Sequence, residues 1–250
     1  MDLELRDRVV IVTGGGRGIG RAVALAYAGA GADVVISAAR NLGEAEEVAT
    51  LGGALPGSIH AVPADVTDAG DVDRLVARAL ELRGRIDVLV NNAARGMRFV
   101  NERFMTDPRP FWEADAEAWR LVIETNILGV FLMSRAVVPH MLAAGRGSII
   151  NVTVNQSTMV RRGFSPYGPS KAALEAMTQV WAAELERTGV HINLLLPGGA
   201  TATGMIQDDM PGGVDLLDPD IIVPPALYLA NARSSGERII ATEWDASRLD

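Results

Sequence analysis

Short runs of apolar, mostly β-branched residues alternate along the chain with longer segments in which apolar residues recur at helical spacing. Runs of this kind predict seven strands, at Val9–Val12, Val34–Ile36, Ile59–Val62, Ile86–Val90, Ser148–Val152, Val190–Leu195 and Arg238–Ile240. Strands separated by helices join through right-handed crossovers and pair in parallel. The pattern therefore predicts an α/β fold with one doubly wound, seven-stranded parallel sheet and helices on both faces.

No internal repeat, low-complexity stretch or Pro/Ser-rich linker divides the chain, so we expect a single domain over residues 1–250. Two long segments, 94–115 and 198–218, each follow a predicted strand. Both should therefore lie at the carboxyl edge of the sheet, where open α/β folds bind their ligands.

The composition narrows the class of partner. A net charge of -8 argues against nucleic acid or an anionic membrane surface, because both attract cationic proteins. The chain has no cysteine, which excludes disulfides and thiolate catalysis and fits a cytoplasmic protein. The first eight residues are too charged for a signal peptide, and Pro197 interrupts the longest uncharged stretch, 192–207. We expect no membrane-spanning segment.

A glycine-rich loop follows the first predicted strand and opens the first helix: Thr13-Gly14-Gly15-Gly16-Arg17-Gly18-Ile19-Gly20. In this position Gly14 allows a tight turn and Gly18 lets the backbone approach a pyrophosphate at the helix N-terminus. Gly20 allows the helix to pack closely on the sheet. The loop therefore predicts a dinucleotide site on a Rossmann-type fold; the alternative is a merely flexible loop.

The end of the second strand bears on which dinucleotide is used. Enzymes that use NAD often carry an acidic residue there, but Ser37, Ala38, Ala39 and Arg40 include no carboxylate. The guanidinium groups of Arg17 and Arg40 suit a 2′-phosphate. We therefore expect NADP(H); the alternative is that both arginines are solvated surface residues and that NAD(H) is bound.

The segment Ser-Pro-Tyr-Gly-Pro-Ser-Lys at 165–171 predicts a helix start, with Ser165 as the N-cap and Pro166 at the first helical position. Tyr167 and Lys171 then share one face of the helix. An ammonium near a phenol favours the phenolate and lowers its pKa from about 10 toward neutrality. Such a phenol can exchange a proton with an alcohol or carbonyl oxygen.

Taken together, these motifs resemble the short-chain dehydrogenase/reductase superfamily over essentially the whole chain. The family's glycine loop matches residues 13–20, and its tyrosine and lysine match Tyr167 and Lys171. Four further motifs match in the same order, at Asp65-Val66, Asn91-Asn92-Ala93-Ala94, Asn126 and Pro197-Gly198.

The resemblance implies hydride transfer between a nicotinamide and a carbonyl or secondary alcohol. It implies that Tyr167 acts as general acid or base, that Lys171 holds the nicotinamide ribose, and that Asn126 supports a water in a proton relay. Asp65 and Val66 would contact the adenine, and Asn92, Ala93, Pro197 and Gly198 would line the cofactor site. It also implies a homodimer or homotetramer. No metal is expected, and the isolated His60, His140 and His191 are interpreted as structural.

The chain departs from the family where a serine usually hydrogen-bonds the substrate oxygen, because that position is Val154. Asn155, Gln156 or Ser157 could supply the donor if the loop turns back after the strand, and we rank Asn155 first. The missing serine leaves a second reading open, a catalytically impaired NADP(H)-binding protein that acts as a sensor or partner subunit.

Two further departures bear on the substrate and the assembly. The segment between Asn92 and Asn126 is longer than usual. It carries the large apolar residues Met97, Phe99, Phe104, Phe111 and Trp112 together with the arginines Arg95, Arg98, Arg103 and Arg109. We expect a wall of the substrate pocket; a subunit contact or a solvated loop is the alternative. At the C-terminus Trp244 replaces a family glycine and is a candidate for a subunit contact.

Overall fold

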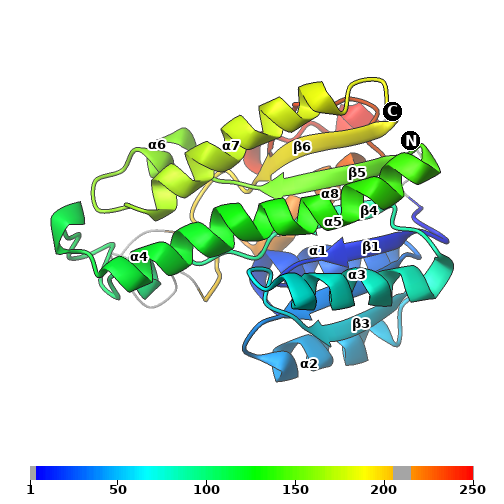
Figure 1. Ribbon diagram of the computed structural model, residues 1–250, viewed down its shortest axis with the longest axis horizontal. Helices are drawn as coiled ribbons and strands as arrows, with labels where there is room; N and C mark the ends of the chain where they lie inside the picture. The colour runs from blue at the N-terminus through cyan, green and yellow to red at the C-terminus, as the bar shows by residue number, and fades with distance from the viewer. Residues whose placement is uncertain (1–3, 205–214, 250) are drawn as a thin grey trace.

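The computed structural model describes residues 4–204 and 215–249, which form a parallel sheet with helices on both faces (Figure 1). The strand order is β3-β2-β1-β4-β5-β6-β7. The strands are β1 (Val9–Val12), β2 (Asp33–Ala38), β3 (Ser58–Pro63), β4 (Val88–Asn91), β5 (Gly147–Val152), β6 (Val190–Leu196) and β7 (Arg238–Ile240). The predicted fold class is confirmed, and β1 and β7 have the predicted limits.

Alternation along the strands sends side chains to two apolar layers. Val10 and Val12 of β1 pack with one layer, and Val9 and Ile11 with the other. The first layer is covered by α1 (Gly18–Gly29), α2 (Leu42–Gly52) and α8 (Val223–Ala230), and the second by α3 (Ala69–Arg83), α5 (Gly129–Ala144) and α7 (Tyr167–Glu184).

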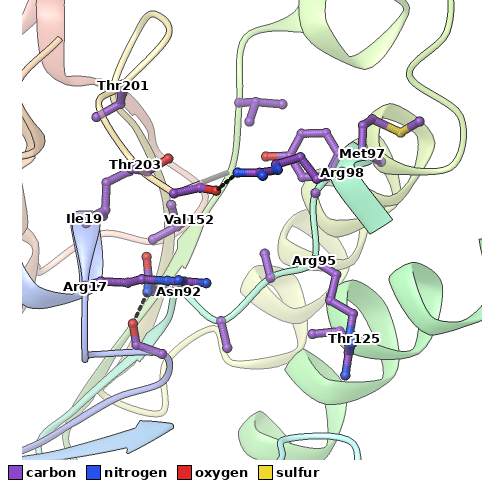
Figure 2. Close-up of a pocket in the computed structure, with 18 of the residues that line it drawn as sticks. Arg17, Ile19, Asn92, Arg95, Met97, Arg98, Thr125, Val152, Thr201 and Thr203 are labelled. Carbon is purple, nitrogen blue, oxygen red and sulfur yellow. Dashed lines mark hydrogen bonds between the residues drawn. The ribbon is translucent and has the colours of Figure 1, made fainter. Parts of the chain in front are cut away.

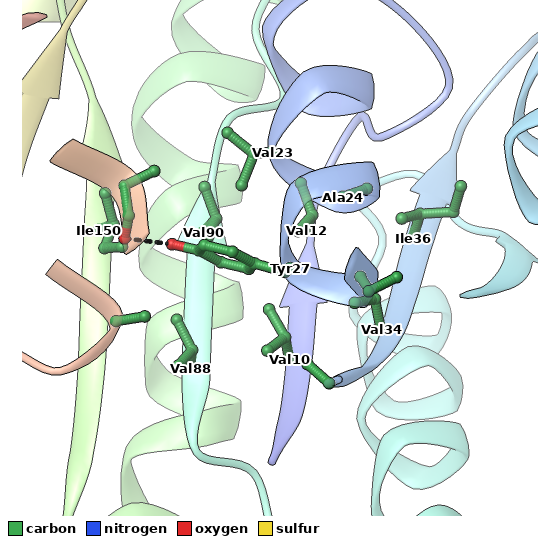
Figure 3. Packing of buried hydrophobic residues seen from close by; sticks show 14 of the residues in the cluster. Val10, Val12, Val23, Ala24, Tyr27, Val34, Ile36, Val88, Val90 and Ile150 are labelled. Carbon is green, nitrogen blue, oxygen red and sulfur yellow. Dashed lines mark hydrogen bonds between the residues drawn. The ribbon is translucent and has the colours of Figure 1, made fainter. Parts of the chain in front are cut away.

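Tyr27 of α1 lies among valines of the first layer (Figure 3). Its hydroxyl is buried and donates to the backbone oxygen of Ala226 in α8 at 2.7 Å. A buried hydroxyl without a partner would be costly, so this bond lets the ring join two helices over the sheet.

The helix that precedes β5 is long and apolar. α4 (Ala116–Ile123), a π-helical turn η3 (Glu124–Leu128) and α5 form one continuous segment, 116–144, that could cross a membrane by length and composition. Within the fold, 44% of its apolar window is buried, and Met133, Val137 and Met141 pack against the sheet. This packing is typical of a helix in a protein core, and such helices also meet the length and composition criterion for a membrane span.

Helix α7 begins one residue later than the sequence predicts. Ser165 does not cap it: Pro166 occupies the N-cap position, and the hydroxyl of Ser165 accepts from Trp119 at 3.4 Å. Backbone carbonyls serve the first turn, since Phe164 accepts from Gly168 at 2.7 Å and Pro166 accepts from Ser170 at 2.9 Å. These bonds satisfy N–H groups that a serine cap would otherwise bind. The remaining short elements are α6 (Gln156–Met159) and the 3-10 turns η1 (Met97–Phe99), η2 (Phe111–Glu113), η4 (Pro219–Ile222), η5 (Ala241–Glu243) and η6 (Ala246–Leu249).

Candidate active site

A cavity of about 950 Å³ opens at the carboxyl edge of the sheet (Figure 2). It is lined by the loops that follow each of the strands β1 to β6, together with the first turns of α7. Both long segments expected at this edge contribute to it, within the described residues. Six basic side chains and three acidic ones line the cavity, so the cleft is basic in a protein of net negative charge.

The glycine loop has the geometry that its sequence predicts. Gly14 has φ +66°, in the region that favours glycine, and its N–H donates to the hydroxyl of Ser37 at 3.2 Å. Gly16, Gly18 and Ile19 line the cavity, and Gly18 is the first residue of α1. A Cβ at Gly20 would overlap the carbonyl oxygen of Gly14. Helix α1 therefore starts directly under the turn, with its N-terminus toward the cavity.

Thr13 and Asn92 join this loop to the end of β4. The hydroxyl of Thr13 accepts from the backbone N–H groups of Asn92 and Ala93, both at 3.0 Å, and donates to Val90 at 3.2 Å. The amide of Asn92 donates to the carbonyls of Thr13 and Gly14 at 2.9 and 3.0 Å. These bonds hold two cavity-lining loops together and bring Asn92 and Ala93 to the cavity wall.

Arg17, in the loop after β1, and Arg40, after β2, both line the cavity. Arg17 is largely exposed and lies 3.7 Å from the carboxylate of Glu44. The guanidinium of Arg40 lies 4.6 Å from the centre of the Phe99 ring. Ser37, Ala38 and Ala39 also line this end of the cavity. None of residues 37–40 carries a carboxylate.

The remaining predicted cofactor residues also reach the cavity. Asp65 and Val66 line it, and the Asp65 carboxylate accepts from the backbone and hydroxyl of Thr67 at 2.9 and 2.7 Å. Pro197 and Gly198 line it after β6, and Gly198 has φ +98°. A Cβ at Gly198 would overlap the Thr242 hydroxyl, so glycine alone fits there.

Tyr167 and Lys171 line the cavity from one face of α7, as the spacing predicts. Burial raises the pKa of the Tyr167 phenol and lowers the pKa of the Lys171 ammonium to about 8. Lys171 donates to the backbone oxygen of Val152 at 2.8 Å. In the protein alone, burial therefore outweighs any lowering of the tyrosine pKa by the neighbouring ammonium, which is the opposite of the direction that we expected from the sequence.

Asn126 lies in the π-helical turn and is fully buried outside the cavity lining. Its amide oxygen accepts from the backbone N–H of Arg95 at 2.8 Å, and its nitrogen donates to the Arg95 carbonyl and the Ser170 hydroxyl, each at 3.0 Å. The side chain thus ties the start of the segment after β4 to α7. Its support of a water stays a prediction.

The loop after β5 places the candidate oxygen donors differently from one another. Val154 lines the cavity and packs against the apolar cluster around Tyr167. Asn155 also lines it, but its amide donates to the Gly198 carbonyl at 2.7 Å. Gln156 and Ser157 are exposed and lie outside the lining, whereas Thr158 lines the cavity. No hydrogen bond of the Thr158 hydroxyl occurs within the described part of the chain.

The long segment after β4 forms a cavity wall in its first part only. Met97, Phe99 and Phe104 line the cavity, together with Arg95 and Arg98. Arg103 pairs instead with Asp107 at 3.1 Å, and Arg109 lies outside this cavity. Phe111 and Trp112 pack on each other with ring centres 5.3 Å apart and are 69% and 73% exposed. The pocket wall that we expected is therefore present in residues 95–105.

Sequence reasoning missed several residues that line the cavity: Thr125, Thr158, Arg161, Phe164, Thr201 and Thr203. Thr158 lies in the short helix α6 and Thr125 in the π-helical turn, and the others lie in loops at the carboxyl edge. The loop after β5 was singled out by its missing serine, and that signal could have led to Thr158.

Trp244 and the histidines have neighbours within the chain. The Trp244 ring lies 5.1 Å from that of Tyr228, and Arg248 stacks beside it. His60 is within hydrogen-bond distance of Ser58 at 3.0 Å, and burial lowers its pKa. In the described ranges, no group of three or more His, Asp or Glu side chains could hold a metal ion.

Comparisons with known proteins agree with this fold. The family model described as short chain dehydrogenase matches residues 8–212. The chain is 38% identical to 3-oxoacyl-[acyl-carrier-protein] reductase of Synechocystis sp., over 82% of this chain and 78% of that one. Two solved structures share the fold. One is 7α-hydroxysteroid dehydrogenase complexed with NADH and 7-oxo glycochenodeoxycholic acid, with TM-score 0.84 and 28% identity over 96% and 94% of the chains. The other is a putative NAD(P) dependent gluconate 5-dehydrogenase from Beutenbergia cavernae with bound NADP, with TM-score 0.78 and 31% identity over 100% and 99%.

Proposed function

Because this chain belongs to the short-chain dehydrogenase/reductase family, whose members are NAD(P)-dependent oxidoreductases, we propose that it transfers a hydride between NADP(H) and a carbonyl or secondary alcohol. The observation that carries the proposal is the joint placement of Tyr167, Lys171 and the glycine loop on one cavity. The reductase and dehydrogenase names of the relatives support the reaction class.

The cavity residues fit a dinucleotide. The N-terminus of α1 and the loop before it offer backbone N–H groups and a favourable dipole to a pyrophosphate. Arg17 and Arg40 offer cations that suit a 2′-phosphate, and none of residues 37–40 at the end of β2 is a carboxylate that would bind the ribose hydroxyls. These features favour NADP(H); the two solved structures name NADH in one case and NADP in the other.

Tyr167 is the group that we assign to proton transfer. Its raised pKa keeps the phenol protonated at neutral pH, so it can donate its proton to a carbonyl oxygen as reduction proceeds. When bound, the reduced nicotinamide supplies the hydride to the carbonyl carbon, and the product is an alcohol. Lys171 is held against Val152 beside β5, in position to hold the ribose and to favour loss of the tyrosine proton once charged.

A matched pair of variants tests this assignment. We expect Tyr167→Phe to lower kcat for NADPH oxidation by roughly 10²–10⁴, the usual range for a general acid, while the Kd of NADPH stays within about twofold. Tyr228→Phe is the control, because Tyr228 packs on Trp244 away from the cavity. A panel of ketones and aldehydes supplies the substrate. Full kcat in Tyr167→Phe, or tight NADPH binding with no turnover by the parent on the whole panel, would overturn the proposal.

A further inference from the structure

Arg161 lies at the cavity in the turn between α6 and α7. Its guanidinium stacks 4.9 Å from the centre of the Phe164 ring. Throughout the residues that the structure describes, this side chain has no ion pair and no hydrogen bond. The next residue, Arg162, is also exposed but does not line the cavity. Arg161 therefore presents a guanidinium with open donors to whatever occupies the cavity.

The wall between Tyr167 and Arg161 is apolar. Met97, Phe104 and Phe164 are buried and form one cluster with Tyr167, against which Val154 packs. The rings of Phe104 and Phe164 meet edge to face, with centres 5.5 Å apart. An apolar segment of a substrate would bury its surface here, at a gain of about 25 cal/mol per Å².

Contacts between two loops fix the turn that carries Arg161. Gly163 has φ +79°, and a Cβ there would overlap the Pro108 side chain, so the segment after β4 packs directly on this turn. The backbone N–H of Phe164 donates to the carbonyl of Arg161 at 3.1 Å. The ring under the guanidinium also limits its freedom, because a cation is attracted to the face of an aromatic ring. These contacts place Arg161 before any ligand arrives.

Arginines line the cavity at the cofactor end and also on the side of Tyr167. Arg17 and Arg40 lie at the end formed by β1 and β2, and Arg161 lies with Tyr167 after β5. Glu102 is the carboxylate that the segment after β4 contributes to the cavity, and it makes no ion pair with Arg161. Arg161, whose ring partner Phe164 belongs to the cluster around Tyr167, is therefore left for a ligand other than the cofactor phosphates.

We propose that Arg161 binds a carboxylate of the substrate, which is an oxo acid or hydroxy acid whose apolar chain separates the acid from the reacting carbon. The carboxylate accepts charge-assisted hydrogen bonds from the guanidinium, and the chain lies on Met97, Phe104 and Phe164. This inference rests on the proposed function, since it names the substrate class of the same site.

Binding of a carboxylate and its neutral ester measures the role of Arg161 without turnover. Octanoate and methyl octanoate are titrated into the protein with saturating NADP⁺, and tryptophan fluorescence gives each Kd. We expect Arg161→Met to weaken octanoate about five- to tenfold, the value of one charge-assisted hydrogen bond at a partly exposed site, and methyl octanoate less than twofold. Methionine keeps an apolar stem over Phe164. Arg162→Met is the matched control and should change neither Kd.

Steady-state kinetics with medium-chain oxo acids and their methyl esters give the second readout. Arg161→Met should raise KM for the acids with kcat little changed, because a distant anchor binds ground state and transition state alike. Equal Kd changes for octanoate and its ester, or the same loss in Arg162→Met, would overturn the inference. Turnover that depends on Tyr167 but ignores the carboxylate refutes the anchor and leaves the proposed function intact. Turnover that survives Tyr167→Phe refutes the proposed function instead.

Discussion

At the scale of single residues, the family pattern puts a serine hydroxyl at the position of Val154, and in this chain the nearby Thr158 carries a hydroxyl instead. Val154 contributes a methyl surface to the cluster around Tyr167, and Thr158 brings a hydroxyl to the same cavity. Asn155, which we ranked first as the donor to the substrate oxygen, donates one amide hydrogen to the Gly198 carbonyl. It therefore braces the loop after β6 against the loop after β5. We propose Thr158 as the donor to the substrate oxygen.

Removing the Thr158 hydroxyl should slow the chemical step. We expect Thr158→Val to lower kcat roughly 10²–10³-fold, the usual effect of losing a donor to a developing oxyanion, and Thr158→Ser to keep most of it. Single-turnover kinetics with saturating NADPH measure the step. Ser157→Ala is the control, because that neighbouring hydroxyl is exposed and outside the cavity. Full activity in Thr158→Val together with a large loss in Asn155→Ala would return the role to Asn155.

At the scale of elements, the 3-10 turn η1 joins three parts of the carboxyl edge. The guanidinium groups of Arg40 and Arg95 both lie close to the Phe99 ring, at 4.6 and 5.1 Å from its centre. Arg95 is anchored in turn by the Thr125 hydroxyl at 2.8 Å. Arg98 reaches across the cavity and donates to the Gly204 carbonyl at 3.0 Å (Figure 2). The segment after β4 therefore orients the arginine that we assign to the 2′-phosphate.

This contact predicts that a residue of the substrate wall affects cofactor choice. The parent should bind NADPH more tightly than NADH, and Arg40→Ala should narrow the difference. We expect Phe99→Ala to narrow it about two- to fivefold, because a cation–π contact of about 0.5–1 kcal/mol no longer orients Arg40. Phe99→Tyr should retain the preference.

Fluorescence titration of both nucleotides gives these Kd ratios. Phe111→Ala is the control, since Phe111 lies on the same segment but is exposed and outside the cavity. Equal Kd values for NADPH and NADH in the parent would refute the assignment of Arg40. An equal effect of Phe111→Ala would show that the segment acts through its general packing.

The sequence predicts elements better than it predicts side-chain directions in loops. Buried strands are visible in the sequence as apolar runs, and β1 and β7 have the predicted limits. The glycine loop also has the predicted tight turn at Gly14. The length of the segment after β4 indicated a pocket wall. Loops have no period, however, so nothing in the pattern separates Phe104, which is buried at the cavity, from Trp112, which is exposed. The predicted start of α7 was one residue too early, because a backbone carbonyl, that of Phe164, accepts the hydrogen bond that we expected the Ser165 side chain to accept.

At the scale of the whole molecule, almost all basic side chains are arginines. The chain has 22 arginines and one lysine, Lys171, which is buried at the cavity. An arginine stays charged at any ordinary pH, whereas a buried lysine loses its proton more readily. Burial lowers the pKa of Lys171 to about 8, and it raises the pKa of the phenols of Tyr27 and Tyr167. The free energy of unfolding should therefore change with pH in the alkaline range.

The free energy of unfolding should rise between pH 8 and about 10. In that window the unfolded chain keeps the Lys171 proton and the folded protein releases it, so rising pH favours the folded state. The rise should approach about 3 kcal/mol over the full interval between the folded and unfolded pKa values. Above about pH 10 the unfolded phenols ionise first, and stability should fall.

Urea unfolding of the cofactor-free protein across this range measures the effect. Lys171→Met should remove the rise and leave the fall above pH 10, because methionine fills the site without a titrating group. An unchanged rise in that variant would assign the pH dependence to other groups.

The burial of the only lysine also makes the molecule selective toward amine-acylating reagents. Lys171 is the single side-chain amine of the sequence, it is buried and lines the cavity, and the arginine guanidinium groups stay protonated and do not react with such reagents. An amine is nucleophilic only when it is unprotonated, so the low pKa of Lys171 makes it reactive in mild alkali. Acylation at Lys171 should therefore report whether the cavity is filled.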